Sequence, residues 1–381
     1  MNVLIFTAIR DDYKGYLGII KKIMYQVSAW ERLGHKAFYC FEDATTLKMY
    51  SSDGIIVEKL EKSSKIIFRK DKYRILPEWV KGHSIDILYV RYDTLDFVAS
   101  KSFAECKTVG AKVLVEFPTY PYKGEVKNAN RRMLDNKQYL QFVIKRLFQL
   151  SERIASKKAS SCIDYFVTFM YEGTIWGVPV ICIDNGVDVS SIPVRIKKKQ
   201  DMLTFICVAN YAKWHGIDRL IDGIAQDPNR DYQVWLVGEG SELQTLKDKV
   251  HENGLENIVH FYGAKTGDDL TELTNCADIG IGSLGLHRIG LTWGSTLKAK
   301  EYCAASLPFI YSYDEKKLTG KEPFAIKLPA DDSPIDMPQV TKWANELIDN
   351  HAIAESMRNF AEENYDWTVI INELIDKIQQ G

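Results

Sequence analysis

The stretch "WGSTLKAKEYCAAS" (293–306) lies between two apolar runs, "DIGIGSLGL" (278–286) and "LPFIYSY" (307–313). This order predicts a strand, a loop, a helix and a second strand, the unit from which parallel α/β sheets are built. The same alternation of short apolar runs and amphipathic segments continues along the chain. The other predicted strands are 2–8, 36–42, 86–92, 111–117, 165–170, 178–184, 202–210, 232–240 and 258–264.

A chain of 381 residues is too long for one ordinary core and suggests two domains. The segment "NGVDVSSIPVRIKKKQ" (185–200) breaks the alternation with turn residues and a basic run, so the linker is expected there. We predict an α/β fold with two Rossmann-like, doubly wound parallel-sheet domains facing a cleft, formed by residues 1–186 and 187–365. The amphipathic segment 366–381 is expected to cross back onto the first domain. Ligands of such folds bind at the carboxyl ends of the strands.

The composition is that of a globular protein, with 46% hydrophobic and 26% charged residues. The net charge of −2 gives no reason to expect a nucleic acid partner. No apolar run reaches the ~18 residues of a spanning helix, and the start "MNVLIFTAIRDD" is typical of a first strand rather than a signal peptide. Seven scattered cysteines without a CxxC pair indicate reduced thiols. The sequence contains neither an HExxH nor a D-x-D motif, so no metal site is predicted. We therefore expect a cytoplasmic protein that needs no metal or other cofactor.

The segment "CVANYAKWHGIDRLIDGI" (207–224) predicts a strand, a polar loop and an amphipathic helix. The loop carries Asn210, Lys213 and His215, and Gly216 opens the helix. Cationic side chains beside a helix N-terminus suit a phosphate, with Lys213 as a permanent cation and His215 as a switchable one. Because an anion holds a proton on an imidazole, we expect a raised pKa for His215 beside a bound diphosphate. The alternative is a solvated loop without a ligand.

A similar turn follows the apolar run in "WLVGEGSEL" (235–243). Gly238 and Gly240 would let backbone N–H groups and a helix N-terminus come close to an anion. As a dinucleotide fingerprint the turn is weak, because Leu243 stands in place of the third glycine and the next strand ends without an acid for the ribose. These features disfavour an oxidoreductase. The alternative to an anion-binding turn is that the glycines are needed only for packing.

The helix of the opening stretch carries Lys298 and Glu301 one turn apart. A hydroxyl of Ser295 or Thr296 could cap its start, and the helix N-terminus with Lys298 could hold negative charge. Glu301 could accept hydrogen bonds from two neighbouring hydroxyls, as a carboxylate does with a ribose diol. A surface ion pair between Lys298 and Glu301 is the alternative, although Glu301 lies close to the apolar side of the helix.

Taken in order, these segments resemble the large family of GT-B glycosyltransferases, whose retaining members include sucrose synthase, glycogen synthase and many bacterial polysaccharide enzymes. The resemblance covers nearly the whole chain and is strongest from 184 to 311. The segment "VEFPTYPYKGE" (115–125) is similar to one in bacterial capsular and surface-polysaccharide transferases. The other segments that carry the resemblance are "GYLGIIKKI", "RLGHKAFYC", "NGVD", "ANYAKWHGIDRLI", "VWLVGEGSEL", "VHFYGAKTGDDLTELTNCADIGIGS" and "STLKAKEYCAASLPFI".

The resemblance implies a nucleotide-sugar on the second domain, an acceptor on the first, and no metal. Glu301 matches the glutamate of the family motif that binds the ribose. Ser295, Thr296 and Leu297 would offer backbone N–H groups to the phosphates. With these residues the nucleotide-sugar donor becomes the expected partner of the second domain.

The chain departs from the family pattern at three of the matched positions. Trp293 stands where the family has a glutamate near the donor sugar. Asn210 and His215 stand where members commonly carry an Arg and a Lys for the diphosphate. These changes leave the sugar and the set of cations open.

Candidates for contact with the acceptor lie in the first domain. Glu116 ends a strand at the expected cleft and could touch the acceptor or the transferring sugar. Tyr120 and Tyr122 could stack on sugar rings, and ordinary loop packing is the alternative for both. The remaining acceptor-side candidates are Gly15, Tyr16, Arg91 and Asp93.

The segment 130–160 predicts a long basic amphipathic helix. Such a helix is often simply solvated on its polar side. If the acceptor is lipid-linked, the basic side could instead rest on anionic lipids at the inner face of the membrane.

We therefore expect a glycosyltransferase that moves a sugar from a nucleotide donor, with UDP favoured, to a saccharide or lipid-linked acceptor for surface polysaccharide. The catalytic candidates are Lys213, Lys298 and Glu116. In the implied mechanism, cations and helix dipoles absorb the charge of the leaving diphosphate and the acceptor attacks from the same face, with retention. Inversion would need a general base, and Glu116 or Asp93 could serve. The alternatives are a nucleotide-sugar epimerase on the same fold and a degenerate module that binds a nucleotide-sugar without turnover.

Overall fold

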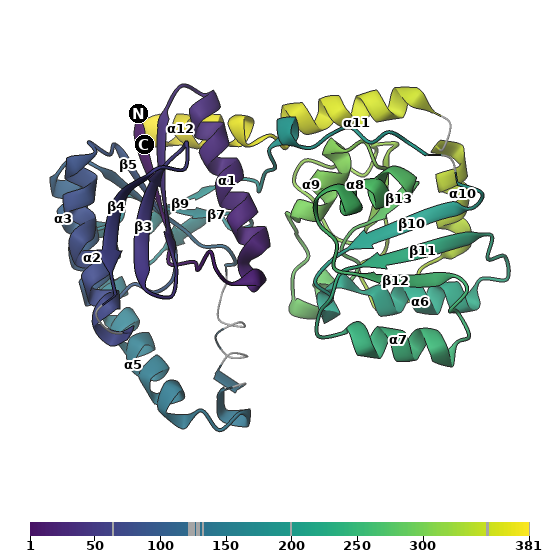
Figure 1. Cartoon of the computed structure of the whole chain (residues 1–381), viewed down its shortest axis with the longest axis horizontal. Helices are drawn as coiled ribbons and strands as arrows, with labels where there is room; N and C mark the ends of the chain where they lie inside the picture. Colours follow the sequence, from purple (N-terminus) through teal and green to yellow (C-terminus); the bar gives the residue numbers. More distant parts are fainter. Residues whose placement is uncertain are drawn as a thin grey trace. The chain divides into compact units, whose positions relative to one another are not determined.

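A computed structural model of the chain describes residues 1–62, 65–120, 126, 130–131, 133–198, 200–347 and 350–380. The chain divides into two compact units (Figure 1). Unit 1 comprises Met1–Asp184 together with Ile370–Gly381, and unit 2 comprises Asn185–Val369. The division therefore lies two residues from the boundary expected at 186.

Unit 1 contains a nine-stranded sheet in the order β4-β3-β2-β1-β5-β6-β7-β9-β8. The central strands run parallel, whereas β2, β3 and β4 are antiparallel to one another in turn and β8 is antiparallel to β9. The hairpin strands β3 and β4 and the short β8 were not predicted. The bounds are β1 (Asn2–Phe6), β2 (Lys36–Glu42), β3 (Thr46–Ser51), β4 (Ile56–Glu61), β5 (Ile87–Arg91), β6 (Lys112–Glu116), β7 (Tyr165–Thr168), β8 (Gly173–Ile175) and β9 (Val178–Cys182).

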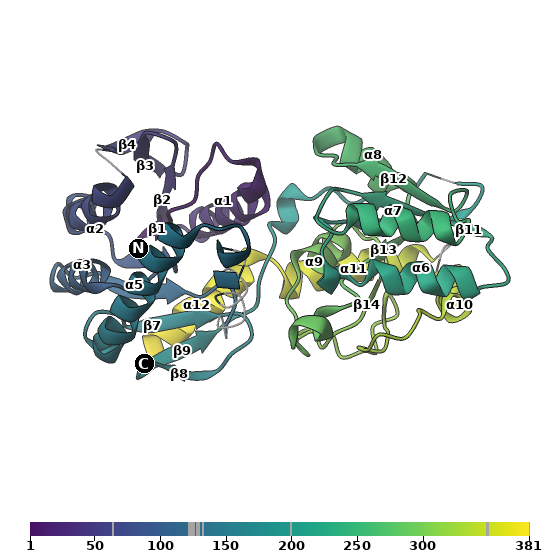
Figure 2. The same ribbon diagram turned by 90° about the horizontal axis from the view of Figure 1, so that it is seen from below.

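Helices cover both faces of this sheet, because the alternating side chains of its central strands are apolar on both sides. Residues of α2 and α3 form one core with Leu4, Phe6, Leu88 and Val90. Figure 2 shows α1 and α12 on the other side of the strands. The helical elements are η1 (Lys14–Tyr16), α1 (Leu17–Arg32), α2 (Lys65–Gly82), α3 (Phe97–Thr108), α5 (Tyr139–Ala155), η2 (Ser156–Ser161) and α12 (Trp367–Gln380).

Helix α12 brings a segment from far along the sequence into unit 1. Its buried side chains Ile370, Ile371, Leu374 and Ile378 recur at helical spacing. The Lys377 ammonium donates to the carbonyl oxygen of Cys182 at 2.8 Å, and the Lys112 ammonium donates to that of Ile378 at 3.2 Å. The helix is thus fixed to the ends of two strands of unit 1.

Unit 2 contains a six-stranded, entirely parallel sheet in the order β12-β11-β10-β13-β14-β15. In Figure 1, α6 and α7 cover one face and α8, α9 and α11 the opposite face. The strands are β10 (Leu203–Val208), β11 (Tyr232–Val237), β12 (Val259–Gly263), β13 (Ile279–Ile281), β14 (Phe309–Tyr311) and β15 (Ala325–Lys327). The helical elements are η3 (Val189–Ser191), η4 (Lys213–His215), α6 (Ile217–Gln226), α7 (Leu243–Glu252), α8 (Gly267–Cys276), η5 (Leu286–Ile289), α9 (Leu297–Ala304), α10 (Met337–Leu347) and α11 (His351–Asn364).

The strand order of unit 2 reverses between β10 and β13, which are neighbours although β11 and β12 lie between them in sequence. In doubly wound sheets, ligands bind at the carboxyl ends of the strands beside such a reversal. In the described part of the chain, no helix is long and apolar enough to cross a membrane.

Candidate functional site

The loops after β10 and β13 pair with each other at the switch point of unit 2. The N–H groups of Leu284 and Gly285 donate to the carbonyl oxygens of His215 (2.9 Å) and Trp214 (3.2 Å). Gly216 makes this possible: it has φ of +64°, and a Cβ there would lie 2.6 Å from the Leu284 carbonyl carbon. The pairing fixes the start of α6 beside the path of the chain towards α9.

His215 is held as a neutral imidazole. Its Nδ1 accepts a hydrogen bond from the backbone N–H of Ala212 at 3.1 Å, so the proton of the neutral ring is on Nε2. Burial, together with the charge of Lys298, lowers the pKa of His215 to about 3. In this structure His215 therefore offers an N–H donor without a charge, whereas the raised pKa expected beside a bound diphosphate stays a prediction.

Lys298 brings the positive charge to this place from the opposite side. It lies in the first turn of α9, is partly buried, and its ammonium is 3.7 Å from the Cys207 thiol near the end of β10. Since the same ammonium also acts on His215, the structure brings together Lys298 and the loop after β10. Two of the sequence-predicted site residues, His215 and Lys298, thus come together from separate elements.

The start of α9 differs from the expectation that Ser295 or Thr296 caps it. Thr296 occupies the N-cap position, but its side chain makes no capping hydrogen bond. Its hydroxyl lies 2.6 Å from that of Tyr313, and the Ser295 hydroxyl accepts from the backbone N–H of Asn185 at 2.9 Å. The first turn of α9, which includes Leu297, therefore begins without a side-chain cap, a state suited to an anion.

The other predicted donor-side residues surround this point with different exposure. Glu301 is partly buried in the second turn of α9, whereas Asn210 and Lys213 are exposed. Trp293 is 53% exposed, and its backbone pairs with that of Asp314. An aromatic side chain is therefore exposed at the position where the resemblance led us to expect a glutamate.

The glycines after β11 act in packing. Gly238 has φ of +135°, and a Cβ there would lie 1.9 Å from the carbonyl oxygen of Ala209. Gly240 has φ of +144° and similarly approaches the backbone of Tyr211, whose N–H donates to the Glu239 carbonyl at 2.5 Å. Close contact with the loop after β10 thus accounts for both glycines, as the packing alternative required.

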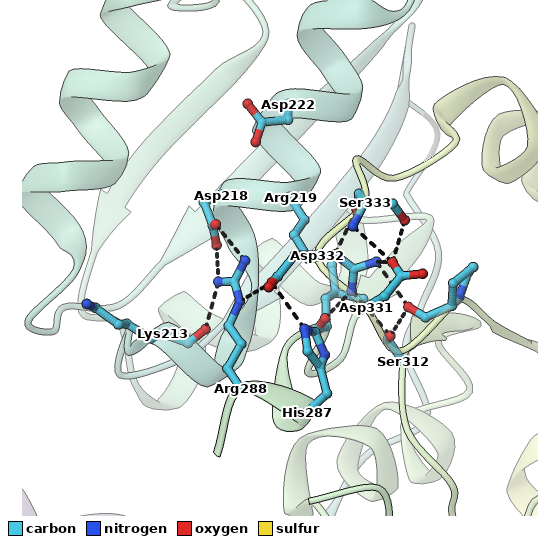
Figure 3. A network of polar contacts seen from close by, with 12 residues as sticks. Lys213, Asp218, Arg219, Asp222, His287, Arg288, Ser312, Asp331, Asp332 and Ser333 are labelled. Carbon is cyan, nitrogen blue, oxygen red and sulfur yellow. Dashed lines mark hydrogen bonds and ion pairs between the residues drawn. The ribbon is translucent and has the colours of Figure 1, made fainter. Parts of the chain in front are cut away.

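A second set of residues at the switch point was not predicted (Figure 3). Arg288 in η5 forms a two-pronged ion pair with Asp218 at 2.7 and 2.8 Å and contacts Asp332 at 2.6 Å. The Asp218 and Asp332 carboxylates raise the pKa of Arg288 further, and its guanidinium also donates to the Lys213 carbonyl at 3.1 Å. Arg288 thereby fixes the backbone that carries the Lys213 side chain.

Arg219 connects the loops that follow three strands (Figure 3). Only 1% of this residue is exposed, and its guanidinium donates to the carbonyls of Ser333 (2.8 Å), Pro329 (3.0 Å) and Leu284 and to the Ser312 hydroxyl (3.3 Å). In the sequence, Arg219 has the position of a polar residue on an amphipathic helix. Nothing local indicates its burial, because loops from β13, β14 and β15 create the surroundings.

In unit 1, Glu116 is buried, whereas we expected it to reach the acceptor or the transferring sugar. The residue is 1% exposed, and its carboxylate accepts from Arg91 (2.7 Å), Tyr89 (2.7 Å), Lys22 (3.1 Å) and Gln26 (3.4 Å). Burial raises the pKa of Glu116, but the charges of Lys22 and Arg91 outweigh it and the net shift is downward. Burial also lowers the pKa of Lys22 to about 8. Glu116 is therefore an ionised group that connects β6 to α1, and it is not available as a base.

Asp93 is held in a similar way. Its carboxylate accepts from Arg69 (2.8 Å), Tyr73 (2.9 Å) and Lys72 (3.4 Å). Burial raises its pKa, but the neighbouring cations outweigh this and lower it. The second candidate for a general base is therefore also engaged in ion pairs.

The aromatic candidates of unit 1 divide into three cases. Tyr120 packs its ring against those of Tyr171 (centroids 4.7 Å apart) and Phe117 (5.5 Å), which agrees with the packing alternative. Tyr16, next to Gly15 in η1, is at the surface, where its ring meets that of Tyr13. Tyr122 lies outside the described residues.

Comparison with known proteins gives a family match over part of unit 2. Residues 188–312, the larger part of unit 2, match the family model described as "Glycosyl transferases group 1". A search of curated proteins gave no match. The chain thus contains a group 1 glycosyltransferase domain.

Solved structures resemble the whole chain at low sequence identity. A glycosyltransferase from Rickettsia africae ESF-5 has a TM-score of 0.65 and 14% identity, with coverage of 100% of this chain and 98% of that one. Anabaena Alr3699/HepE in complex with UDP has a TM-score of 0.60 and 12% identity, with coverage of 100% of both chains. Sucrose-phosphate synthase from Thermosynechococcus elongatus has a TM-score of 0.60 and 12% identity, with coverage of 100% of this chain and 98% of that one. These likenesses confirm the predicted GT-B fold, and the domain match makes the chain an enzyme of the nucleotide-sugar glycosyltransferase class.

Proposed function

We propose that the protein transfers a sugar from a UDP-sugar to a saccharide or lipid-linked saccharide acceptor in surface-polysaccharide synthesis, with retention of configuration and without a metal. The observation that carries the donor half is the meeting of His215, Lys298 and the uncapped start of α9 at the switch point of unit 2. A structural relative that is described in complex with UDP supports this choice of nucleotide.

The proposed donor site uses three kinds of group. The diphosphate lies at the N–H groups of Thr296 and Leu297, with the Lys298 ammonium and the His215 Nε2–H as further donors. Glu301 accepts hydrogen bonds from the ribose hydroxyls. As the bond between the anomeric carbon and the phosphate oxygen breaks, negative charge grows on the diphosphate, so the cation and the helix N-terminus stabilise the transition state more than the bound donor.

Retention is supported by the state of the two carboxylates that could have served as a base for inversion. Glu116 and Asp93 each accept hydrogen bonds from cations and a tyrosine, and the pKa of each is lowered. In the retaining reaction the acceptor hydroxyl attacks on the face that the diphosphate leaves. Its proton passes to the departing phosphate oxygen, so that no protein base is required.

An alternative is a module that binds a nucleotide-sugar without turnover. The exposed, uncharged Asn210 and the neutral His215 favour it, because they leave fewer cations than the family pattern has. An epimerase on the same fold would release an isomerised nucleotide-sugar. For all three the proposed location is the cytoplasm, with lipid-linked acceptors reached at the inner face of the membrane.

One experiment separates these functions. The protein is incubated with a panel of nucleotide-sugars, with and without excess EDTA, and the released nucleotide and the sugar are followed. Slow donor hydrolysis that persists in EDTA, with the released sugar keeping its anomeric configuration, is the expected result. UDP binding without any release would establish the binding module, an isomerised donor the epimerase, and a loss of activity in EDTA would overturn metal independence.

A further inference from the structure

Helix α5 exposes a stripe of aliphatic side chains. The exposed fractions are 75% for Leu140, 52% for Val143, 62% for Leu147, 55% for Leu150 and 48% for Ile154. These positions follow the spacing i, i+3, i+7, i+10 and i+14, so they lie on one side of the helix. We call these five residues the α5 stripe.

A neighbouring side of α5 contacts unit 1. Of its residues only Ala155 is buried. Ile144 and Phe148 line a pocket of about 270 Å³ with Arg69 and Thr94, and the Arg69 guanidinium lies 5.5 Å from the centre of the Phe148 ring. The α5 stripe is therefore the side of the helix that points away from unit 1, and Figure 1 shows α5 extending beyond the end of α2.

Other helices of unit 1 show how unusual this is. Helix α1 buries its apolar side chains, such as Ile23, Val27 and Trp30, against the sheet. Soluble monomers rarely leave a contiguous apolar stripe of this length in water, because covering it is favourable in proportion to its area. The stripe is thus better explained by an occupant than by solvent.

The charges beside the stripe indicate what the occupant is. The segment 139–158 contains five Lys or Arg side chains and one acid, Glu152, in a chain whose net charge is −2. At about 100° per residue, Arg146 and Arg153 lie along one border of the α5 stripe, and both are exposed. A second copy of the chain would bring like charges together, whereas an anionic lipid surface complements both the cations and the apolar side chains.

We propose that α5 lies in the interfacial layer of an anionic phospholipid membrane, with the α5 stripe inserted and Arg146 and Arg153 at the headgroups. The inference deepens the proposed function, on which its link to a lipid-linked acceptor rests. It also changes the expectation from the sequence: the apolar side of the helix makes the contact, and the basic residues flank it.

The test is co-sedimentation of the full chain with vesicles of equal parts phosphatidylglycerol and phosphatidylcholine, and with pure phosphatidylcholine. We expect binding to the mixed vesicles only, with release above ~0.5 M salt. The double variant Leu147→Gln/Leu150→Gln should lower the partition coefficient at least ~10-fold, because two aliphatic side chains no longer enter the interface. Arg146→Gln/Arg153→Gln should lower it ~10-fold or more at low salt.

Matched controls lie outside α5. Ile196→Gln removes an aliphatic side chain of unit 2 that is 76% exposed, and Lys101→Gln removes an exposed cation of α3; neither should change binding. Equal binding to both kinds of vesicle, binding to neither, or equal losses in the controls would overturn the proposal. So would a dimer in solution that Leu147→Gln/Leu150→Gln dissociates without any vesicle binding, since the stripe would then contact a second copy.

Donor hydrolysis measured without vesicles keeps the two proposals apart. Normal hydrolysis by a protein that binds no vesicles overturns the membrane surface alone. Specific vesicle binding by a protein that hydrolyses no nucleotide-sugar overturns the proposed activity alone.

Discussion

Replacing His215 tests whether it binds the diphosphate as a neutral donor. Its Nδ1 accepts a hydrogen bond from the Ala212 N–H, and burial together with the charge of Lys298 lowers its pKa to about 3. For half of the imidazoles to be protonated at pH 7, the bound diphosphate would have to stabilise the imidazolium by ~5 kcal/mol, because each pKa unit corresponds to about 1.36 kcal/mol. A hydrogen bond to a charged group supplies only ~1.5–3 kcal/mol. The imidazole should therefore stay neutral when UDP binds.

The variants follow from this geometry. His215→Gln keeps an N–H donor and should bind UDP within about threefold of wild type, since a change of ~0.6 kcal/mol covers a shift in donor position. His215→Ala removes the donor and should weaken binding by ~1.5–3 kcal/mol, or roughly 10- to 150-fold. Both variants lie on a loop fixed mainly by backbone hydrogen bonds, so unfolding temperatures should confirm that they remain folded.

Isothermal titration calorimetry of UDP in buffers of different ionisation enthalpy measures the protons taken up on binding. Because UDP contributes its own protons in every case, the difference between wild type and His215→Gln isolates the imidazole. We expect a difference of ~0.1 proton or less at pH 7. A difference near one proton would refute the neutral-donor reasoning if the UDP affinity of wild type alone also fell ~10-fold for each unit by which the pH is raised.

Three further changes test other parts of the site. Glu301→Ala should weaken UDP by ~1–3 kcal/mol and should bind 2′,3′-dideoxy-UDP as wild type does; an undiminished preference for the natural ribose would exclude this contact. Lys298→Ala should lower kcat ~100-fold in steady-state assays with a smaller effect on donor affinity, and Lys213→Ala should lower kcat less because Lys213 is exposed. A larger loss of kcat in Lys213→Ala would assign the catalytic charge to Lys213. Arg219→Met leaves several buried carbonyls without a donor and should destabilise unit 2 by ~3 kcal/mol or more in urea unfolding, against ~0.5 kcal/mol for the surface control Lys247→Met; equal effects would mean that the loops close without Arg219.

The main strands of the fold could be predicted because each is a continuous apolar run, as expected for parallel strands buried on both faces. The β3–β4 hairpin was missed although it has a turn signal. Asp53 and Gly54 form the turn, with Gly54 at φ of +83° and its N–H donating to the Ser51 carbonyl. Its strands alternate charged and apolar residues irregularly, and β4 is largely exposed, so no clear period of two appears.

The candidate site was predictable where a local pattern carries the chemistry. The start of α9 with Lys298, and the loop with His215, follow from strand–loop–helix spacing. The uses of Ser295, Glu116 and Arg219 depend on partners distant in sequence, namely Asn185 for the hydroxyl, Lys22 for the carboxylate and three loops for the guanidinium. The same holds for the pKa of His215, which burial and a charge from another helix determine.

The return of α12 to unit 1 has a consequence for synthesis of the protein. Unit 2 is encoded by one uninterrupted stretch and can fold as soon as that stretch has left the ribosome. Unit 1 lacks the side chains of Ile370, Ile371, Leu374 and Ile378 until after unit 2 has been made, so the part of its sheet that α12 covers stays exposed until then. The unit that is translated first is thus completed second, and a ribosome that stalls before residue 370 would release a folded unit 2 attached to an unfinished, aggregation-prone unit 1.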